Sequence, residues 1–485
     1  MSKKKMFIVA AALILCLALA GVLAACAGSD GVGVKSIEKT GSEGSTDIYT
    51  VYYTDGTTTT FEVQNGTDGA DGESVSAQDI YEQYKLATGD TLTYEEFIDK
   101  YLDVTVAQDN SEVISSVLRS TAAVYTEFYE TQSSFPMGGS LSGTAVYTGS
   151  AVIYKIEGDH TWFITNYHVV YSENANEDNL TYSRSGADDQ HIARRIILYL
   201  YGSEGTPVKS GETNDYTAYD YGKYAIECEY AGGSEQNDLA LLKAKTADVK
   251  AINSDVCEVS FAEGYDVGDT AIVIGNTGGD GISVTEGIVS VHSENIYLEI
   301  SGEKTVHRSM RVDAAMYGGN SGGGCFNVYG QLIGVPHAGN GEEEQGINYA
   351  IPVDTVKSVV DNLYHYAASG KLGAYKVTLG VTVTEENSRY VYDEMSGSGK
   401  ITADTVVKEV TEGGIAAALG LQAGDKIIKV TLPGGEYTLT RSYMLNYPLF
   451  ALKEGDTFTI TYERGGEEHT TAAHTVAAGE LAKVA

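Results

Sequence analysis

Asp313-Ala-Ala-Met-Tyr-Gly-Gly-Asn-Ser-Gly-Gly-Gly324 is the stretch on which the interpretation of this sequence depends. It places Ser321 among glycines, whose backbones adopt conformations that other residues avoid. The amides of Gly319, Asn320 and Ser321 are therefore able to turn toward one point in front of the serine hydroxyl. Such a loop is only a flexible turn unless the chain also supplies a base and an acid that act with the serine.

Both partners lie upstream, in Ile164-Thr-Asn-Tyr-His-Val-Val170 and Asn237-Asp-Leu-Ala-Leu-Leu-Lys243. A serine hydroxyl is a poor nucleophile at neutral pH, so His168 is expected to accept its proton. Asp238 is expected to hold the other imidazole nitrogen and to stabilise the imidazolium. The order His, Asp, Ser along the chain is that of the chymotrypsin-type triad. We therefore predict that His168, Asp238 and Ser321 are catalytic and that the three amides form an oxyanion hole.

The bulk composition excludes several classes of function. The chain has 485 residues and a formal net charge of −35, with 67 acidic and 32 basic side chains. This length accommodates roughly three domains of ordinary size. So acidic a surface repels nucleic acids and anionic lipid headgroups, and we expect no nucleic-acid partner. The sequence has no CxxC pair and no HExxH motif, so we expect no metal and no other cofactor.

The N-terminus resembles a bacterial lipoprotein leader. Lysines at positions 3–5 precede an apolar run at 6–25, which is the order of a signal peptide. The run ends at Leu23-Ala-Ala-Cys26, which resembles a lipobox, whose cysteine receives a diacylglyceryl group. We predict a signal peptide at 1–25, lipidation of Cys26 and attachment to the extracytoplasmic face of a bacterial cell membrane. The alternative is an uncleaved signal anchor.

Two small elements are expected before the main body of the chain. In the linker at 26–75, the segments 48–54 and 57–63 flank Asp55-Gly56, a strong signal for a two-residue hairpin. In 76–111, Thr93-Tyr-Glu-Glu96 is a capping box in front of an apolar helical face. We expect this small helical unit to act as a spacer, with binding of a cell-wall component as the alternative.

The main body has a β pattern. Residues 112–370 alternate short apolar segments with glycine-rich turns, which predicts an all-β domain of two barrels closed by a helix at 354–368. A second, smaller β-rich domain is expected at 376–478. The long Tyr- and Asp-rich stretch at 171–224 is left open as a lid, an oligomer contact or a disordered segment. The expected strands are 122–128, 149–156, 162–166, 225–230, 239–244, 270–275 and 331–335.

Five motifs in this order resemble those of the HtrA/Deg family of trypsin-like serine proteases, over roughly residues 115–478. The resemblance implies a mainly β chain with a chymotrypsin-like double β-barrel. It further implies a serine endopeptidase that acts on unfolded or misfolded extracytoplasmic proteins through an acyl-enzyme, assembled as a homotrimer. The motifs are Thr165-Asn-Tyr-His-Val-Val170, Asp238-Leu-Ala-Leu-Leu-Lys243, 267–276 with 285–290, Gly319-Asn-Ser-Gly-Gly323 and Gly346-Ile-Asn-Tyr-Ala-Ile-Pro352.

The region 376–478 resembles the PDZ domain of the same family. Thr378-Leu-Gly-Val381 resembles its carboxylate-binding loop, and Gly420-Leu-Gln-Ala-Gly-Asp425 resembles a turn typical of these domains. The resemblance implies that Leu379, Gly380 and Val381 bind peptide C-termini by strand addition. The alternative is a PDZ domain that only packs on the protease domain.

Residues around the serine bear on specificity and control. Ala315 lies where trypsin-like relatives place the base of the primary specificity pocket, and Asn348 is expected to line the same pocket. With no charge there, we expect cleavage after small or medium apolar residues. Asn320 replaces the aspartate that pairs with a newly cut N-terminus in zymogen-type relatives, so control by loop rearrangement or PDZ occupancy is expected instead. Gly318, at a position that commonly carries a larger residue, predicts a looser oxyanion loop.

The alternative function is a catalytically silent chaperone or peptide-binding protein that uses the same cleft and PDZ domain. A disordered oxyanion loop would favour it, whereas the presence of a complete His, Asp and Ser set favours the enzyme. The sequence identifies neither the natural substrates nor the activating signal. It also leaves open whether Cys228, Cys257 and Cys325 form a disulfide.

Overall fold

The computed structural model divides the chain into two compact units, Met1–Gln108 and Asp109–Ala485, which are described separately. The predicted signal peptide, Cys26 and most of the predicted helical unit at 76–111 lie outside the described residues. None of the helices in the described part of the chain is long and apolar enough to cross a membrane. The described residues are 34–43, 46–64, 81–82, 85, 93, 110–133, 140–212, 216–302, 304–339, 346–394 and 398–484.

The N-terminal unit contains a three-stranded antiparallel sheet in the order β1-β2-β3. The predicted hairpin is present as β2 (Thr46–Tyr53) and β3 (Thr58–Gln64). Its turn uses a glycine with φ of 86° at Gly56, and the Asp55 carboxylate accepts a hydrogen bond from the Thr57 amide at 2.9 Å. The sheet also contains β1 (Val34–Glu43), a strand that was not expected in the predicted linker and that pairs with β2.

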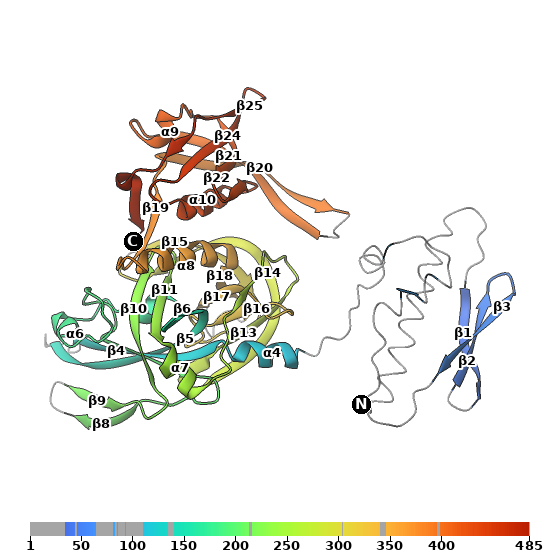
Figure 1. The fold of residues 1–485 in the computed structure, drawn as a ribbon, viewed down its shortest axis with the longest axis horizontal. Helices are drawn as coiled ribbons and strands as arrows, with labels where there is room; N and C mark the ends of the chain where they lie inside the picture. The colour runs from blue at the N-terminus through green and yellow to red at the C-terminus, as the bar shows by residue number, and fades with distance from the viewer. Residues whose placement is uncertain are drawn as a thin grey trace. The chain divides into compact units, whose positions relative to one another are not determined.

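The first barrel of the second unit is closed by six strands in the order β10-β11-β6-β5-β4-β7 (Figure 1). Its interior is filled by fully buried apolar side chains such as Phe128, Ile153, Phe163 and Leu242. The strands are β4 (Thr121–Ser133), β5 (Ser140–Glu157), β6 (His160–Thr165), β7 (Arg195–Leu200), β10 (Ile226–Ser234) and β11 (Leu239–Lys245), and α4 (Ser111–Leu118) precedes them.

The second barrel is formed by β13, β14, β15, β18, β17 and β16, and the β17–β18 pairing closes it. Val273, Val289, Met310 and Ile333 are buried in its core. The mainly β, double-barrel fold expected from the sequence is therefore confirmed. The strands are β13 (Thr270–Asn276), β14 (Ile282–Glu299), β15 (Lys304–Val312), β16 (Gly324–Phe326), β17 (Gln331–Gly339) and β18 (Asn348–Pro352), with β12 (Ser260–Phe261) parallel to β17.

The stretch at 171–224, left open by the sequence, is largely ordered structure of the first barrel. It contributes α6 (Glu177–Thr181), the barrel strand β7 and a two-stranded hairpin of β8 (Val208–Glu212) and β9 (Thr217–Asp220). Two other short helices complete the barrels, α5 (Tyr167–Val170) and α7 (Thr246–Ile252), with one 3₁₀ turn, η1 (Thr277–Gly279). Cys228, Cys257 and Cys325 are free thiols, so they form no disulfide.

Helix α8 (Val353–Ala367) joins the barrels to the C-terminal β unit (Figure 1). It contacts β10 and β11 of the first barrel, β17 of the second, and β19 and α10 beyond it. This contact is apolar, since Val356, Val359, Val360 and Leu363 of the helix are all 0% exposed.

The C-terminal unit is built on a sheet in the order β20-β21-β22-β24-β25. Strand β27 pairs with β19 and extends the unit to Val484, beyond the expected end at 478. Its elements are β19 (Ala374–Val377), β20 (Val381–Asp393), β21 (Ser398–Val410), α9 (Ile415–Ala418), β22 (Lys426–Leu432), β23 (Gly435–Thr438), η2 (Ser442–Leu445), α10 (Asn446–Ala451), β24 (Thr457–Arg464), β25 (Glu467–Thr470), β26 (His474–Thr475), η3 (Ala478–Glu480) and β27 (Leu481–Val484).

Candidate active site

His168 and Asp238 face each other between the ends of two paired strands. His168 lies in α5 directly after β6, and Asp238 lies in the turn between β10 and β11. The His168 Nδ1 atom is 2.8 Å from Asp238 Oδ2, and the His168 backbone amide donates to Oδ1 at 3.0 Å. The Asp238 side chain is 0% exposed, whereas that of His168 is 33% exposed. The imidazole is therefore held on one side and open to a reactant on the other.

Asp238 is held in a conformation that most residues avoid. Its φ of 49° is one of two positive values among the described non-glycine residues. A conformation of this kind costs about 1–3 kcal/mol and is kept where the surroundings enforce it. Here the enforcing contacts are the donors around the carboxylate and the Asn166 side chain, whose Nδ2 donates to the Asp238 carbonyl at 2.8 Å.

The two groups shift each other's ionisation. Burial alone would raise the pKa of Asp238, but His168 and His337 outweigh it and hold that pKa below its ordinary range. Burial opposes the charged form of His168, yet the neighbouring Asp238 carboxylate outweighs burial and raises the pKa of His168 above its ordinary value. This carboxylate–imidazole pair is the arrangement of a general base that is oriented by an acid.

The loop that carries Ser321 is fixed against the segment that leads into His168. The Ser150 amide donates to the Ser321 carbonyl at 2.8 Å. A Cβ atom added to Gly322 would lie 2.3 Å from Thr165 Oγ1 and 3.0 Å from the Asn166 amide nitrogen, so only glycine fits there. The structure therefore brings the Ser321 loop and the His168–Asp238 pair to one place. In the part of the chain that the structure describes, the Ser321 hydroxyl forms no hydrogen bond; such bonds often tighten only when substrate is bound.

The oxyanion loop has a defined set of peptide orientations. A trans peptide directs its C=O and N–H to opposite sides. The Gly318 carbonyl accepts from the Gly278 amide at 2.7 Å, so the Gly319 N–H points away from Gly278. The Asn320 carbonyl accepts from the Gly323 amide at 3.0 Å, which directs the Ser321 N–H away from Gly323. These two hydrogen bonds hold both peptide groups of the loop, so they do not support the looser loop expected from Gly318.

Only two of the three predicted oxyanion donors are free. The Asn320 amide donates to the Tyr317 carbonyl at 3.1 Å, so this member of the predicted set is occupied. No hydrogen bond among the described residues uses the amides of Gly319 or Ser321. Gly319 has φ of 97°, and a Cβ atom there would lie 2.1 Å from the Asn276 carbonyl oxygen. Glycine is thus required for this donor to face the site.

Ser150 supports this loop and was not singled out from the sequence. It is fully buried in β5, its hydroxyl donates to the Gly319 carbonyl at 2.7 Å, and the same hydroxyl accepts from the Asn276 amide at 2.7 Å. Thr165 Oγ1 donates to the Ser150 carbonyl, also at 2.7 Å. One serine of the first barrel therefore fixes the loop of the second.

The predicted specificity residues lie on neighbouring segments. Asn348, at the start of β18, donates through Nδ2 to the Ala314 carbonyl at 2.8 Å. The next residue, Ala315, is exposed, and its carbonyl accepts from Thr285 Oγ1 at 2.7 Å. Buried Asn348 is thus in contact with the segment that carries Ala315, and both members of the predicted pair are uncharged.

The predicted peptide-binding loop leads into an edge strand. Val381 begins β20, which pairs only with β21 among the strands that the structure describes. Gly380 has φ of 72°, and its carbonyl accepts from the Thr411 amide at 2.8 Å. The Leu379 side chain is buried, and its carbonyl accepts from the Ala416 amide at the start of α9. Among the described contacts, none uses the amides of Leu379 and Gly380.

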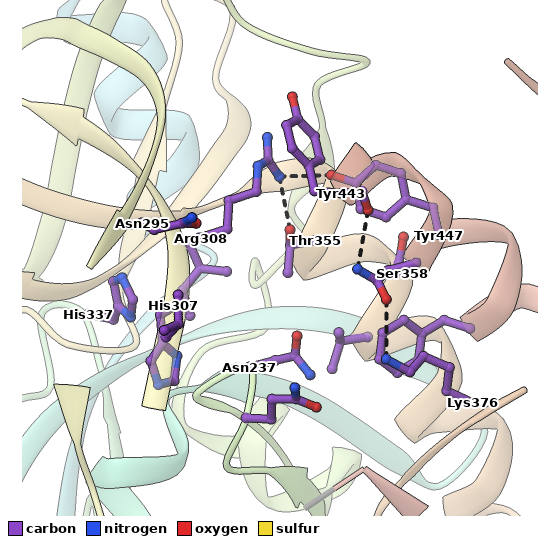
Figure 2. Close-up of a pocket in the computed structure, with 16 residues that line it drawn as sticks. Asn237, Asn295, His307, Arg308, His337, Thr355, Ser358, Lys376, Tyr443 and Tyr447 are labelled. Carbon is purple, nitrogen blue, oxygen red and sulfur yellow. Dashed lines mark hydrogen bonds between the residues drawn. The ribbon is translucent and has the colours of Figure 1, made fainter. Parts of the chain in front are cut away.

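A second histidine, missed from the sequence, also reaches Asp238. The Nδ1 atom of His337, on β17, is 3.4 Å from Asp238 Oδ2. Figure 2 shows His337 beside His307 at one end of a cavity of about 220 Å³, with Arg308 and Lys376 further along it. A lone histidine after Gly334-Val-Pro336 carries no motif, so only the fold could show that it reaches the acid.

Comparisons with known proteins identify similar sequences. Residues 149–335 match the family model described as a trypsin-like peptidase domain. The "Serine protease Do-like HtrA" of Lactococcus lactis is 29% identical over 333 residues, which are 66% of this chain and 69% of the relative. The Bacillus subtilis protein of the same name is 26% identical over 377 residues, which are 75% of this chain and 72% of the relative.

Solved structures of the same type are also similar. The "HtrA-type protease AlgW with tripeptide" has a TM-score of 0.46 and 24% identity, covering 77% of this chain and 97% of that one. A serine endoprotease from Yersinia pestis has a TM-score of 0.40 and 20% identity, covering 78% and 98%. The family model and the curated relatives define the class: the chain is a serine-type endopeptidase with a trypsin-like domain. The curated relatives described above carry names of HtrA-type proteases.

Proposed function

We propose that this endopeptidase cleaves unfolded or misfolded polypeptides outside the cytoplasm, with Ser321 as nucleophile, His168 as general base and Asp238 as the acid that orients it. The observation that carries the proposal is the placement of the Ser321 loop against the His168–Asp238 pair. It is fixed there by the 2.8 Å bond from the Ser150 amide to the Ser321 carbonyl.

The reaction follows from the positions of the donors. Ser321 Oγ attacks the scissile carbonyl while His168 Nε2 takes its proton, and Asp238 stabilises the imidazolium through Nδ1. The amides of Gly319 and Ser321 stabilise the oxyanion that forms on the substrate oxygen. The imidazolium then returns its proton to the leaving amine. Water attacks the resulting acyl-enzyme with His168 again acting as base, which releases the acid product and restores Ser321.

The C-terminal unit is proposed to act as a PDZ domain that binds peptide C-termini. An incoming peptide would extend the sheet at the edge strand β20 and place its carboxylate at the amides of Leu379 and Gly380. The glycine at position 380 agrees with this proposal, because a φ of 72° is unfavourable for residues that carry a side chain. A peptide bound here is the proposed activating signal. It is testable by the binding of C-terminal peptides and of their amidated forms, which should bind far more weakly.

The remaining proposals concern specificity, location and assembly. Uncharged Ala315 and Asn348 favour cleavage after small or medium apolar residues, and a preference for Lys or Arg in peptide profiling would contradict this.

The predicted leader would attach the enzyme to the outer face of a bacterial cell membrane through a lipid on Cys26. Metabolic labelling with a fatty acid, compared between wild type and Cys26→Ala, tests the lipid. Resemblance to the family also implies a homotrimer, which sedimentation measures directly.

Casein cleavage by the full chain tests the proposed activity, with Ser321→Ala as the matched control. Cleavage by the wild type that is lost in Ser321→Ala is expected. Cleavage that persists in a folded Ser321→Ala variant would reject Ser321 as nucleophile. The alternative, a catalytically silent chaperone, is not favoured because the contacts at Gly318, Gly319 and Asn320 order the oxyanion loop. If the wild type suppressed aggregation but cleaved no casein, the chaperone function would be favoured instead.

A further inference from the structure

The Asp238 carboxylate is shared by two imidazoles. His168 Nδ1 lies 2.8 Å from Oδ2, and His337 Nδ1 lies 3.4 Å from the same oxygen. The Asp238 and His337 side chains are both 0% exposed. Water therefore screens this second contact much less than it would screen a contact between exposed groups.

The surroundings of His337 determine which nitrogen carries its proton. Its Nε2 is 2.9 Å from the buried hydroxyl of Ser309 on β15, whereas its Nδ1 forms no hydrogen bond among the described residues and has the Asp238 carboxylate 3.4 Å away. If Nε2 carried the proton, the Nδ1 lone pair would face the Asp238 carboxylate, which is repulsive. If instead Ser309 donates to Nε2, then Nδ1–H points at the carboxylate and both contacts are favourable.

The other charged or titratable groups near His337 reinforce this assignment. His307 on β15 lies beside it, with ring centroids 6.0 Å apart. Burial lowers the pKa of His307 to about 4, so this neighbour is neutral near pH 7. Arg308 and Lys376 line the same cavity further away (Figure 2). The nearest full charge that faces His337 is therefore Asp238.

We propose that His337 is a positioning residue that donates to Asp238 and so limits how strongly Asp238 attracts the proton of His168. The proposal rests on the proposed roles of His168 and Asp238. Without the Nδ1–H donor, the carboxylate would be more basic and His168 would hold its proton to higher pH. The acidic limb of activity would then move upward, and less of the enzyme would carry a free base near neutral pH.

Two amide substitutions distinguish the contact that His337 makes through Nδ1 from the contact that it makes through Nε2. The Asn side chain places its amide nitrogen where His Nδ1 lies, so His337→Asn keeps a donor for Asp238 and loses the contact with Ser309. The longer Gln side chain reaches the position of Nε2, so His337→Gln keeps the contact with Ser309 and loses the donor for Asp238. Both variants bury one amide, which makes each the control for the other.

The test is the titration of His168 in the purified full chain, followed by NMR of isotopically labelled imidazoles, beside the pH dependence of kcat/KM. The His168 resonance is assigned with His168→Asn, and melting curves establish that the variants fold. We expect His337→Gln to raise the pKa of His168 and the acidic limb by about 0.5–1 unit. His337→Asn should stay close to the wild type.

Equal shifts in the two folded variants, or no shift in either, would overturn the proposal. The NMR titration does not depend on catalysis, so it separates this proposal from the proposed function. A His168 pKa that moves as expected in a chain that cannot cleave casein would support the role of His337 and reject the enzyme activity assigned to the site.

Discussion

At the scale of single residues, two adjacent glycines of the site differ in how much space they leave for a side chain. A Cβ atom on Gly319 would lie 2.1 Å from the Asn276 carbonyl oxygen, whereas one on Gly318 would meet nothing within 4 Å. Gly319→Ala should therefore turn its amide out of the site and lower kcat by about 10²–10³, the usual effect of losing one oxyanion donor. Gly318→Ala should leave kcat near the wild-type value. Steady-state kinetics on a peptide substrate would measure both, and equal losses would contradict the assignment of the donors.

The pairing of His168 with Asp238 predicts the pH dependence of the reaction. A base must be neutral to accept a proton, so activity falls as the pH drops through the pKa of His168. Because the Asp238 carboxylate raises that pKa above the ordinary 6.5, the acidic limb of kcat/KM should lie above pH 6.5. In Asp238→Asn, the limb should move to lower pH and kcat should fall by about 10⁴. A limb at the same pH in both proteins would show that another group controls it.

At the scale of elements, a buried ion pair joins strand β4 to the segment that begins β7. Arg194 Nη2 donates to Glu127 Oε1 at 2.6 Å, with side chains only 3% and 1% exposed. The Tyr221 hydroxyl donates to the other carboxylate oxygen at 2.7 Å. These contacts attach the middle and the C-terminal end of the stretch at 171–224 to strand β4 of the first barrel, which explains why it is part of the domain and not a lid.

Breaking this buried pair should be costly, because one charge would be left in the interior. Arg194→Met is expected to lower the free energy of unfolding by about 3–5 kcal/mol. The exposed pair of Lys357 and Asp361, with side chains 57% and 46% exposed, is the control, and Lys357→Met should cost about 0–1 kcal/mol. Urea denaturation measures both values. Similar small losses in the two variants would contradict the structural role of the buried pair.

The strands that the sequence predicted are those whose apolar residues stand between clear turns. The segments around Phe163 and Leu241 are short, buried and bounded by polar residues, and both form barrel strands. Strand β7 was missed because its run of buried residues lies inside a stretch rich in Tyr and Asp. Of strand β14 only the segment 285–290 was expected, through the family resemblance; its residues are mostly exposed or half-buried over 18 positions, which leaves little apolar periodicity.

The local motifs predicted which residues form the candidate site but not what supports them. Asp238 was found from its motif, yet its φ of 49° depends on donors that arrive from elsewhere in the chain. Ser150 and His337 reach the site from β5 and β17, and neither lies in a distinctive sequence pattern. Their roles depend on contacts between the two barrels or between distant strands, which spacing along the chain does not reveal.

At the scale of the whole molecule, Arg308 links the second barrel to the C-terminal unit. Its Nη1 donates to the Tyr447 hydroxyl at 2.8 Å and to Asp354 at 2.6 Å. Its guanidinium lies 3.7 Å from the centroid of the Tyr443 ring, a close cation–π contact. These contacts surround the cavity of Figure 2, so the C-terminal unit should unfold together with the barrels.

Arg308→Met should weaken this link and separate the unfolding of the C-terminal unit from that of the barrels. Differential scanning calorimetry should then resolve two transitions where the wild type shows one. Arg311→Met is the matched control, since Arg311 lies on the same strand but pairs within the barrel with Glu294 at 2.6 Å. Two transitions in the Arg311 variant as well would show that the separation does not depend on the link through Arg308.

The central claim is that Ser321 is the residue that attacks the substrate. The most direct measurement is to treat the full chain with a fluorophosphonate, which reacts with activated serines, and to locate the adduct by peptide mass spectrometry. We expect one adduct per chain, on Ser321, and none in His168→Ala, because the hydroxyl is activated only by its base. An adduct on another serine, or equal labelling without His168, would contradict the assignment of the active site.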